Sequence, residues 1–536
     1  MKKNILTIAY SVALISLMSY NLFATIRYVS PSGNNTTGLS WTNAWTTITT
    51  HWGSLSAGDY VYFDGGVDST VFSGGWEPTV SGSAAGGWIH LFAGRYSPSP
   101  SGHSGRVIIS GGTMNIHLQN DAYYWIRGFE LTNANTHSVY IEDTGSHNII
   151  DSCYIHNFNY GNNADGYGIK IIARADSTII RNCYIQDKVN GAGQSDILQI
   201  NWDSGNHAHF PSRTIIHDNF FESRSQDPSA HNDVIQSIGC DGFIIYNNIL
   251  ISDSVNSQQG GGMPFILSDV NYGFDYPVII FNNVAYMGGI WYVGGNYSKV
   301  MNTRHDSNGG AVATNQPSNV FLFNNTFINN GPTCSVVEQE YLIHYFSNNI
   351  VASWCPTDRA ADWRFNLQGN GGYGGVTGRL HVDSTRNNLI WRERNTQTNL
   401  FTGSFNARGG GTFTPSTWSS WVSNNGTGVN ADPQLVTKIG RNPNQSSLVP
   451  DILETSPAIG AGQNLTYKVN YLVTTFNLPD DIKQAMLRDF YGNLRGSSWD
   501  IGAVQYQQGG GSQFKIMGTT ISKIQGVAPS KVWGIQ

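Results

Sequence analysis

The chain has few charged residues and no excess of basic ones. Only 12% of its 536 residues are Asp, Glu, Lys or Arg, and the formal net charge at pH 7 is -6. Without a basic field it lacks the electrostatic means of holding a phosphate backbone, so nucleic acid is excluded as a partner. An acidic ligand would instead need local Lys, Arg or a bound cation.

Long apolar runs are missing, apart from one at the N-terminus. There Met1-Lys2-Lys3 precedes an apolar stretch from Ile5 to Leu17, and Leu22-Phe23-Ala24 follows it. A basic start, a short apolar core and a small residue at the end predict a signal peptide over residues 1–24. A membrane anchor is the alternative, although the run is shorter than the roughly 20 residues that span a bilayer. We expect a secreted or cell-surface protein, extracellular or periplasmic, with no transmembrane segment in the mature chain.

Cysteine is scarce, with five residues in the whole chain. In an oxidising compartment an odd number leaves at least one cysteine unpaired or paired between chains. Cys334 and Cys355 lie in turn-like segments and are candidates for a bridge. The spacing leaves the pairing of the five open.

Amphipathic runs of ten or more residues, which helical repeats require, are not found either. Instead, a short phrase recurs between residues 145 and 392: two or three apolar residues, a polar pair, and more apolar residues. Ile149-Ile150-Asp151-Ser152-Cys153-Tyr154 and Ile279-Ile280-Phe281-Asn282-Asn283 are examples. The repeats are roughly 24 to 42 residues apart, as expected when each coil carries its own insertion. Short strand-like runs in so long a period predict an all-β fold, a parallel β-helix with three strands per coil.

The second residue of each polar pair is predicted to form a column inside this helix. Its members would be about 4.8 Å apart in a parallel stack, and they are Cys153, Cys183, Asn219, Asn248, Asn283, Asn325, Asn349 and Asn388. An Asn amide both donates and accepts, and it also tolerates the left-handed backbone of a tight bend. Cys153 and Cys183 would replace two rungs as small buried residues. We interpret the column as structural.

Three stretches carry a resemblance to a known family. They are Tyr28-Val29-Ser30-Pro31-Ser32-Gly33-Asn34 with Trp41, Trp45 and Gly58-Asp59-Tyr60-Val61-Tyr62-Phe63; the Asn repeat; and Ser456-Pro457-Ala458-Ile459-Gly460-Ala461-Gly462 with Asp489, Gly492, Arg495 and Asp500-Ile501-Gly502-Ala503-Val504. Together they resemble the secreted right-handed parallel β-helix proteins of the pectate-lyase-like superfamily, the last stretch being similar to that family's closing coil. The resemblance implies a right-handed β-helix over residues 25–506. It leaves the activity open, because this architecture carries lyases, hydrolases, epimerases and adhesins.

The last segment, residues 507–536, differs in composition. A Gly/Gln-rich linker leads into three Lys-aliphatic-x-Gly units that begin at Lys515, Lys523 and Lys531. Such a tail would serve surface attachment or self-assembly, and a frayed terminus is the alternative.

Polar residues recur at equivalent positions on successive repeats between residues 165 and 237. Asp196 and Asp233 are separated by nearly the same interval as rungs Cys183 and Asn219, which places them one coil apart. Lys170, Gln199 and Gln236 would form a second column. A buried Lys is costly, so this column is placed outside, with Leu198 and Ile235 inside. Asp196 and Asp233 are then assumed to stand at the corner before each strand.

Two carboxylates so close would repel, so they must share a proton, bind a cation or face a basic group. With Ca²⁺ held by Asp165, Asp196 and Asp233, the site would neutralise a uronate, and Lys170 or His231 would remove the adjacent proton. Without metal, the Asp196/Asp233 pair would hydrolyse a glycosidic bond. The structural alternative is that both Asp accept turn hydrogen bonds. Gln199, Gln236, Trp202 and Tyr167 are the candidate substrate-binding residues.

Motifs of related enzymes are absent. The chain lacks the Asp-Asp and Gly-His-Gly pattern of polygalacturonases, the Asn-Gly-x-Glu signature of β-helix alginate lyases and chondroitinases, and the Asp-Pro-His-Asp motif of mannuronan epimerases. The candidate residues therefore depend on geometry alone. The leading hypothesis is a polysaccharide lyase that cleaves a uronic-acid-containing glycan by β-elimination. A glycoside hydrolase and a non-catalytic carbohydrate-binding adhesin or surface fibre are the alternatives.

Overall fold

A computed structural model describes the chain from residue 24 onward, with gaps. The described residues are 24–161, 165–187, 195–202, 209–224, 232–252, 262–270, 276–288, 300–304, 320–329, 337–339, 345–353, 365–367, 385–392, 401–405, 409–413, 428–436, 451–507, 514–516 and 519–521. The predicted signal peptide, apart from Ala24, lies outside them, as do Cys334 and Cys355. No helix among the described residues is long and apolar enough to cross a membrane.

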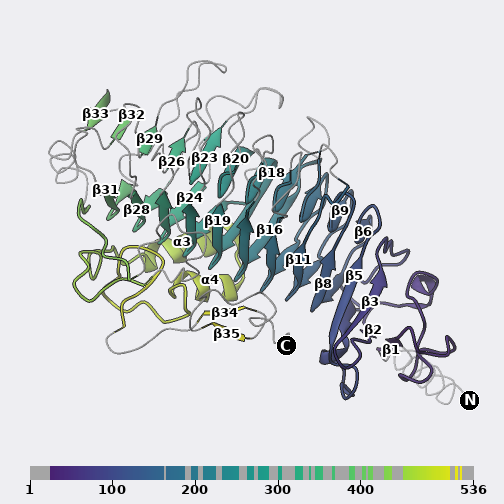
Figure 1. Ribbon diagram of the computed structural model, residues 1–536. Helices are drawn as coiled ribbons and strands as arrows, with labels where there is room; N and C mark the ends of the chain where they lie inside the picture. Colours follow the sequence, from purple (N-terminus) through teal and green to yellow (C-terminus); the bar gives the residue numbers. More distant parts are fainter. Residues whose placement is uncertain are drawn as a thin grey trace, which may run out of the picture.

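Three parallel sheets wind along one axis, as predicted for a right-handed parallel β-helix (Figure 1). Sheet A contains β1 (Ile26–Val29), β2 (Tyr60–Phe63), β4 (Ile89–Ala93), β7 (Tyr124–Arg127), β10 (Ile149–Asp151), β13 (Ile179–Arg181), β16 (Ser212–His217), the second half of β18 (Ile235–Tyr246), β21 (Val278–Phe281), β24 (Val320–Phe323), β27 (Tyr345–Ser347) and β30 (Thr385–Arg386).

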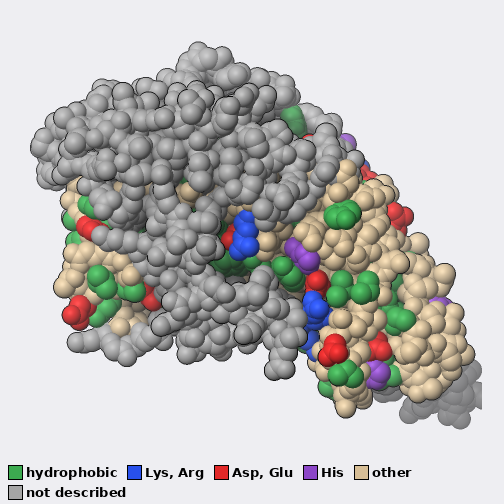
Figure 2. All heavy atoms as spheres, viewed as in Figure 1, with side chains coloured by type: hydrophobic (Ala, Val, Ile, Leu, Met, Phe, Trp, Pro, Cys, Tyr) green, Lys and Arg blue, Asp and Glu red, His purple; other side chains and the backbone are tan. Residues whose placement is uncertain are grey.

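Sheet B follows sheet A in each coil. It contains β3 (Ser69–Ser73), β5 (Arg106–Ser110), β8 (Phe129–Thr132), β11 (Tyr154–His156), β14 (Tyr184–Gln186), β17 (Phe220–Ser223), β19 (Ile249–Ser252), β22 (Val284–Met287), β25 (Thr326–Asn329), β28 (Ile350–Ser353) and β31 (Leu389–Arg392). Figure 2 shows that charged side chains are sparse on the described part of the face it presents.

Sheet C precedes sheet A in each coil and carries the candidate site. It contains β6 (Ile116–Gln119), β9 (Val139–Glu142), β12 (Ile169–Ile172), β15 (Leu198–Asn201), the first half of β18, β20 (Phe265–Val270), β23 (Met301–Arg304), β26 (Val337–Gln339), β29 (Phe365–Leu367), β32 (Phe401–Phe405) and the antiparallel β33 (Gly409–Phe413). Because β18 runs from sheet C into sheet A, these two sheets are continuous.

Strand alternation fills the interior with aliphatic and aromatic side chains. Ile150, Ile180 and Ile216 are paired in register on successive coils, and all three are fully buried. The N-terminal coils are joined to this core by Trp52, whose ring lies edge-on to those of Trp76 and Tyr124. Two short 3-10 turns, η1 (Trp52–Ser54) and η2 (Gly94–Tyr96), lie in this region.

The predicted Asn column is confirmed. The Nδ2 of Asn219 donates to the Oδ1 of Asn248 at 3.0 Å, and the same bond recurs between each later pair at 2.9 to 3.2 Å, through Asn388. The left-handed bend, however, belongs to the residue before each rung. Ser152, Asn182, Asp218, Asn247, Asn282, Asn324, Asn348 and Asn387 have φ between 52° and 56°. The tight turn thus falls on the first polar residue, and the second points inward.

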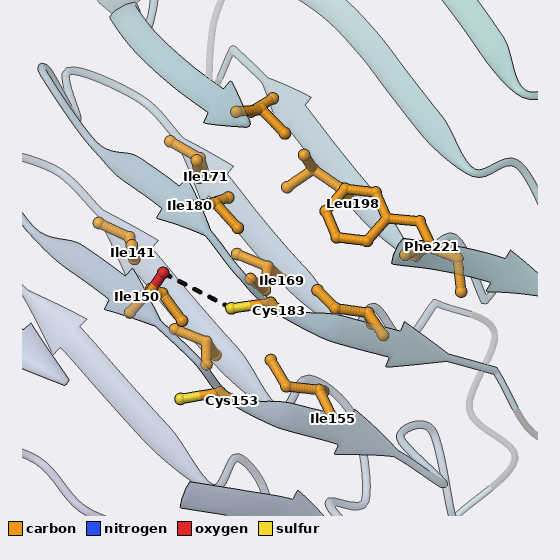
Figure 3. Close-up of a cluster of buried hydrophobic side chains, with 14 of the residues drawn as sticks. Ile141, Ile150, Cys153, Ile155, Ile169, Ile171, Ile180, Cys183, Leu198 and Phe221 are labelled. Carbon is orange, nitrogen blue, oxygen red and sulfur yellow. Dashed lines mark hydrogen bonds between the residues drawn. The ribbon is translucent and has the colours of Figure 1, made fainter. Parts of the chain in front are cut away.

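Cys153 and Cys183 replace two rungs of this column, as predicted. Both side chains are fully buried, and both thiols are free in this structure. Figure 3 shows them among Ile150, Ile155, Ile169 and Ile180, with the Cys183 thiol bonded to the Ile150 carbonyl oxygen at 3.5 Å.

Residues 451–506 do not wind as a closing coil, contrary to expectation. They contain two helices that the sequence pattern does not predict, α3 (Thr466–Phe476) and α4 (Asp480–Met486). Leu472, Ile482 and other apolar residues of this segment pack on the outer face of sheet A, against residues such as Ile244 and Phe321. We call residues 451–506 the strap. Figure 1 shows α3 and α4 beside the later coils.

The strap is held by the outer residues of the polar pairs. Asn348 exchanges two 2.8 Å hydrogen bonds with the backbone of Gln463, and Asn387 donates to the Ala461 carbonyl. Asn282 donates to the Arg488 carbonyl and accepts from the buried Arg495 guanidinium. The second residue of each polar pair thus links neighbouring coils inside the β-helix, and the first residue of several pairs holds the strap on the outside. Beyond the strap, β34 (Phe514–Ile516) and β35 (Thr519–Ile521) pair antiparallel, and Lys523 and Lys531 lie outside the described residues.

Candidate functional site

The predicted Lys/Gln/Gln column exists on the outer face of sheet C. Lys170 pairs in register with Gln199, and Gln199 pairs with Gln236. The intervening side chains of Ile169, Leu198 and Ile235 are fully buried in the core. Strand alternation therefore places the polar and apolar residues on opposite sides of the wall, as the sequence predicts.

Lys170 is half-buried between aromatic rings. Its ammonium lies 4.7 Å from the centre of the Tyr167 ring and 6.0 Å from that of Tyr140. Burial lowers the pKa of Lys170 below the ordinary lysine value, although the carboxylates of Asp165, Asp196 and Glu142 act in the opposite direction. A larger fraction of this lysine is therefore neutral at a given pH than of a solvated one, which is what a general base requires.

Tyr167 is almost fully buried beside Lys170, with 2% of its surface exposed. Burial raises the pKa of its phenol far above the ordinary value, and the charges of Asp196 and Asp165 raise it further. The hydroxyl consequently keeps its proton across the physiological range. A protonated phenol next to a partly neutral amine forms an acid and base pair within one small region.

Asp196 and Asp233 lie two residues before β15 and β18, at the corners where the sequence analysis assumes them to be. Both are fully buried. The Asp233 amide donates to Oδ1 of Asp196 at 2.8 Å, and the amides of Gly262 and Met263 donate to Oδ1 of Asp233 at 3.0 and 2.8 Å. Each carboxylate thus caps the backbone of the next coil. These bonds stabilise the two carboxylates, and they fit the structural alternative.

The two glutamines form a hydrogen-bonded chain that ends on Asp233. Gln199 donates to the Oε1 of Gln236 at 2.6 Å, and Gln236 donates to Oδ2 of Asp233 at 3.2 Å. Both side chains are 2% exposed. The Oε1 of Gln199 is buried and has no hydrogen-bond partner among the described residues, which is uncommon for a buried polar atom.

The remaining predicted residues take different positions. Asp165 is exposed, and its charge acts on both Lys170 and Tyr167. Trp202 follows β15 and packs edge-on against Phe210 at 5.5 Å between ring centres, three residues beyond Gln199. His231 lies outside the described residues.

The column extends two coils further toward the N-terminus than the sequence analysis predicts. Lys170 pairs with Tyr140, and Tyr140 with His117, whose rings are stacked 5.2 Å apart. The His117 ring nitrogen Nε2 lies 2.7 Å from Oε1 of Glu142. The signal was present, because Ile116-His117-Leu118 and Val139-Tyr140-Ile141 repeat the alternation around Lys170. It is less evident because the outward residues differ in type from coil to coil.

A buried histidine separates the two tyrosines of this face. Burial, and then the charges of Lys170 and His117, lower the pKa of His137 to about 3. The ring is therefore neutral, and its Nδ1 accepts a hydrogen bond from the Tyr167 amide at 3.2 Å. His137 thus fixes the backbone from which the Tyr167 phenol projects.

The donors do not form a calcium cage in the described part of the chain. No group of three or more His, Cys, Asp or Glu residues there is arranged to hold a metal ion. Oδ1 of Asp196 and both oxygens of Asp233 already accept hydrogen bonds from the protein. In this arrangement Asp165, Asp196 and Asp233 do not present the set of oxygen ligands that Ca²⁺ requires.

Comparisons with known proteins give structural neighbours only. No family model and no curated protein matches the sequence. The crystal structure of pectate lyase Pel9A matches with a TM-score of 0.45 and 13% identity, over 90% of this chain and 96% of that one. The complex of XylC with xylose matches with a TM-score of 0.43 and 10% identity, over 90% and 98%. A rhamnogalacturonan lyase matches with a TM-score of 0.40 and 13% identity, over 63% and 84%. These values are too low to assign an activity.

Proposed function

We propose that the protein is a secreted, carbohydrate-active β-helix protein, a polysaccharide lyase that cleaves a uronic-acid-containing glycan by β-elimination. The observation that carries the proposal is the position of Lys170. It is a half-buried lysine with a lowered pKa, at the centre of a polar column on an otherwise regular sheet face. Perturbed titratable groups with hydrogen-bonding neighbours are typical of active sites.

The two reacting groups have complementary protonation states. In β-elimination a base removes the C5 proton of the uronate, the C4–C5 double bond forms, and the bond to the glycosidic oxygen breaks. Neutral Lys170 would take the C5 proton, and the Tyr167 phenol would protonate the leaving oxygen.

The hydrolase alternative receives less support from the geometry. An inverting or retaining pair must present both carboxyl groups to the sugar. Asp196 and Asp233 are both fully buried, and both accept hydrogen bonds from backbone amides. Their replacement is therefore expected to lower stability rather than to remove one chemical step.

The first test is an assay with a panel of anionic polysaccharides. The full chain is incubated with each, and the ultraviolet absorbance of unsaturated chain ends is followed together with the release of reducing ends. We expect both signals to rise for at least one uronate polymer. Reducing ends without absorbance would indicate hydrolysis. Binding without either signal would indicate an adhesin, and both of these results would overturn the proposal.

A matched pair of lysine variants then tests the base. Lys170→Ala is expected to lower kcat at least about 100-fold, which is the usual contribution of a general base. Lys468→Ala is the control, because Lys468 is also lysine with a burial-lowered pKa and lies 4.7 Å from the ring centre of Tyr471, but on α3. Full activity in Lys170→Ala would show that the base is another residue.

A further inference from the structure

The column of inward rungs begins with two thiols on neighbouring coils. Asp151 pairs with Arg181 and Tyr154 pairs with Tyr184, so the intervening Cys153 and Cys183 occupy the same position one coil apart. The Tyr184 amide donates to the Cys153 carbonyl at 3.0 Å, which confirms that the backbones run side by side there. Figure 3 shows both side chains pointing the same way from adjacent coils.

These two coils are not joined by the side-chain amide hydrogen bond that links the later ones. From Asn219 onward, each rung donates an amide hydrogen to the next. The Cys183 thiol has only backbone carbonyl oxygens as oxygen acceptors, those of Arg181 at 3.2 Å and Ile150 at 3.5 Å. The ladder of amide bonds therefore starts one coil later, where the Cys183 amide donates to Oδ1 of Asn219.

We propose that Cys153 and Cys183 form a disulfide that joins these coils when the chain folds under oxidising conditions. Equivalent residues of adjacent parallel strands are about 4.8 Å apart. This lies inside the Cα range of roughly 4.4 to 6.8 Å found across disulfides and slightly beyond their Cβ range of roughly 3.5 to 4.5 Å, so the two coils must approach by a few tenths of an ångström for the bond to close. The bond would supply covalently the link that the amide ladder supplies elsewhere. Cys240, the other cysteine of the described residues, lies in β18, where its thiol is 3.2 Å from the Ser237 hydroxyl.

The reaction requires a low-molecular-weight disulfide as oxidant. The Cys153 thiolate attacks one sulfur of it, forms a mixed disulfide and releases one thiol. The Cys183 thiol then loses its proton and attacks Sγ of Cys153, which releases the second thiol. Two protein thiols are oxidised and one small disulfide is reduced. Because both cysteines are fully buried in the folded chain, these steps occur before the two coils close.

The test compares the full chain refolded from denaturant with oxidised glutathione and with excess reductant. Free thiols are then alkylated in denaturant, and the peptides are mapped by mass spectrometry. We expect a Cys153–Cys183 peptide pair in the oxidised sample and two alkylated cysteines in the reduced one. Full alkylation of both after oxidation, or pairing of either with Cys240, Cys334 or Cys355, would overturn the proposal. Neither result bears on the proposed lyase activity.

Variants separate the bond from the packing at this position. Because the bond constrains the unfolded chain, the oxidised wild type should melt about 5 °C above the reduced one. Cys183→Asn, which offers an amide to the column, should lose this difference, whereas Cys240→Ala should keep it. A redox-dependent shift that persists in Cys183→Asn would contradict the assignment.

Discussion

The outer faces of sheets A and C share one strand alternation but meet different surroundings. On sheet C the outward column carries His117, Tyr140, Lys170, Gln199 and Gln236. On the later coils of sheet A, the outward residues are apolar, and α3 and α4 of the strap cover them. The interior is the same beneath both faces. The coil fixes which residues point outward on both faces, and on sheet A the apolar character of those residues lets the strap pack on them.

Loss of the contact between the strap and sheet A is expected to have the largest effect on stability. Leu472 is fully buried between α3 and sheet A, so Leu472→Asp places an unpaired charge in an apolar contact. We expect the free energy of unfolding to fall by about 5 kcal/mol, measured by urea denaturation. Tyr471→Asp is the control, since the neighbouring Tyr471 is 46% exposed. Equal effects of the two changes would show that the strap does not cover this face in solution.

Variants of Asn325 and Asn324 compare how much the second and the first residue of one polar pair contribute to stability. The Asn325 amide donates to two backbone carbonyls and to Asn349, so Asn325→Ala leaves several buried groups unpaired. A loss of about 3 kcal/mol is expected. Asn324 is also buried, but neither amide atom of its side chain has a partner among the described residues.

Asn324→Gly should therefore be nearly neutral in the same denaturation experiment. Glycine accepts the left-handed backbone at φ 56°, and the unpaired amide is removed. A loss as large as that of Asn325→Ala would mean that a further group, such as an ordered water, binds Asn324.

The smallest expected effect is a pH shift on sheet C. Lys170 acts as a base when neutral, so kcat/KM should rise with pH through the pKa of Lys170 and then level off. The Glu142 carboxylate raises that pKa, so Glu142→Gln should lower it and move the rising limb to lower pH. Asp143→Asn, a change at the neighbouring carboxylate, should leave the limb in place. A shift to higher pH in Glu142→Gln would contradict Lys170 as the base.

The sequence predicted the outward column because strand alternation leaves no other choice. Ile169, Leu198 and Ile235 must fill the core, so Lys170, Gln199 and Gln236 must face outward. The same rule places His117 and Tyr140 on that face. A histidine and a tyrosine, however, do not resemble the lysine and the glutamines of the later coils, so the five residues do not form an obvious repeat in the sequence. A site assembled from unlike residues on successive coils is visible only once the register is known.

The strap could not be predicted in the same way. Its helices α3 and α4 are short, and their apolar residues match a surface made by strands more than a hundred residues earlier. The hydrogen bonds of Asn282 to Arg488 and of Asn348 to Gln463 likewise join distant segments. No local pattern contains that information.

The repeated polar pair by itself determined the three-sided coil, the inward amide column and the direction of each strand residue. These features follow from local backbone geometry and from the need to pair buried amides. Only the tertiary structure decided that Asp196 and Asp233 accept hydrogen bonds from backbone amides of the next coil, and that the later coils of sheet A are covered while Lys170 stays partly exposed. Those outcomes depend on which distant atoms come within bonding distance, which a one-dimensional pattern does not specify.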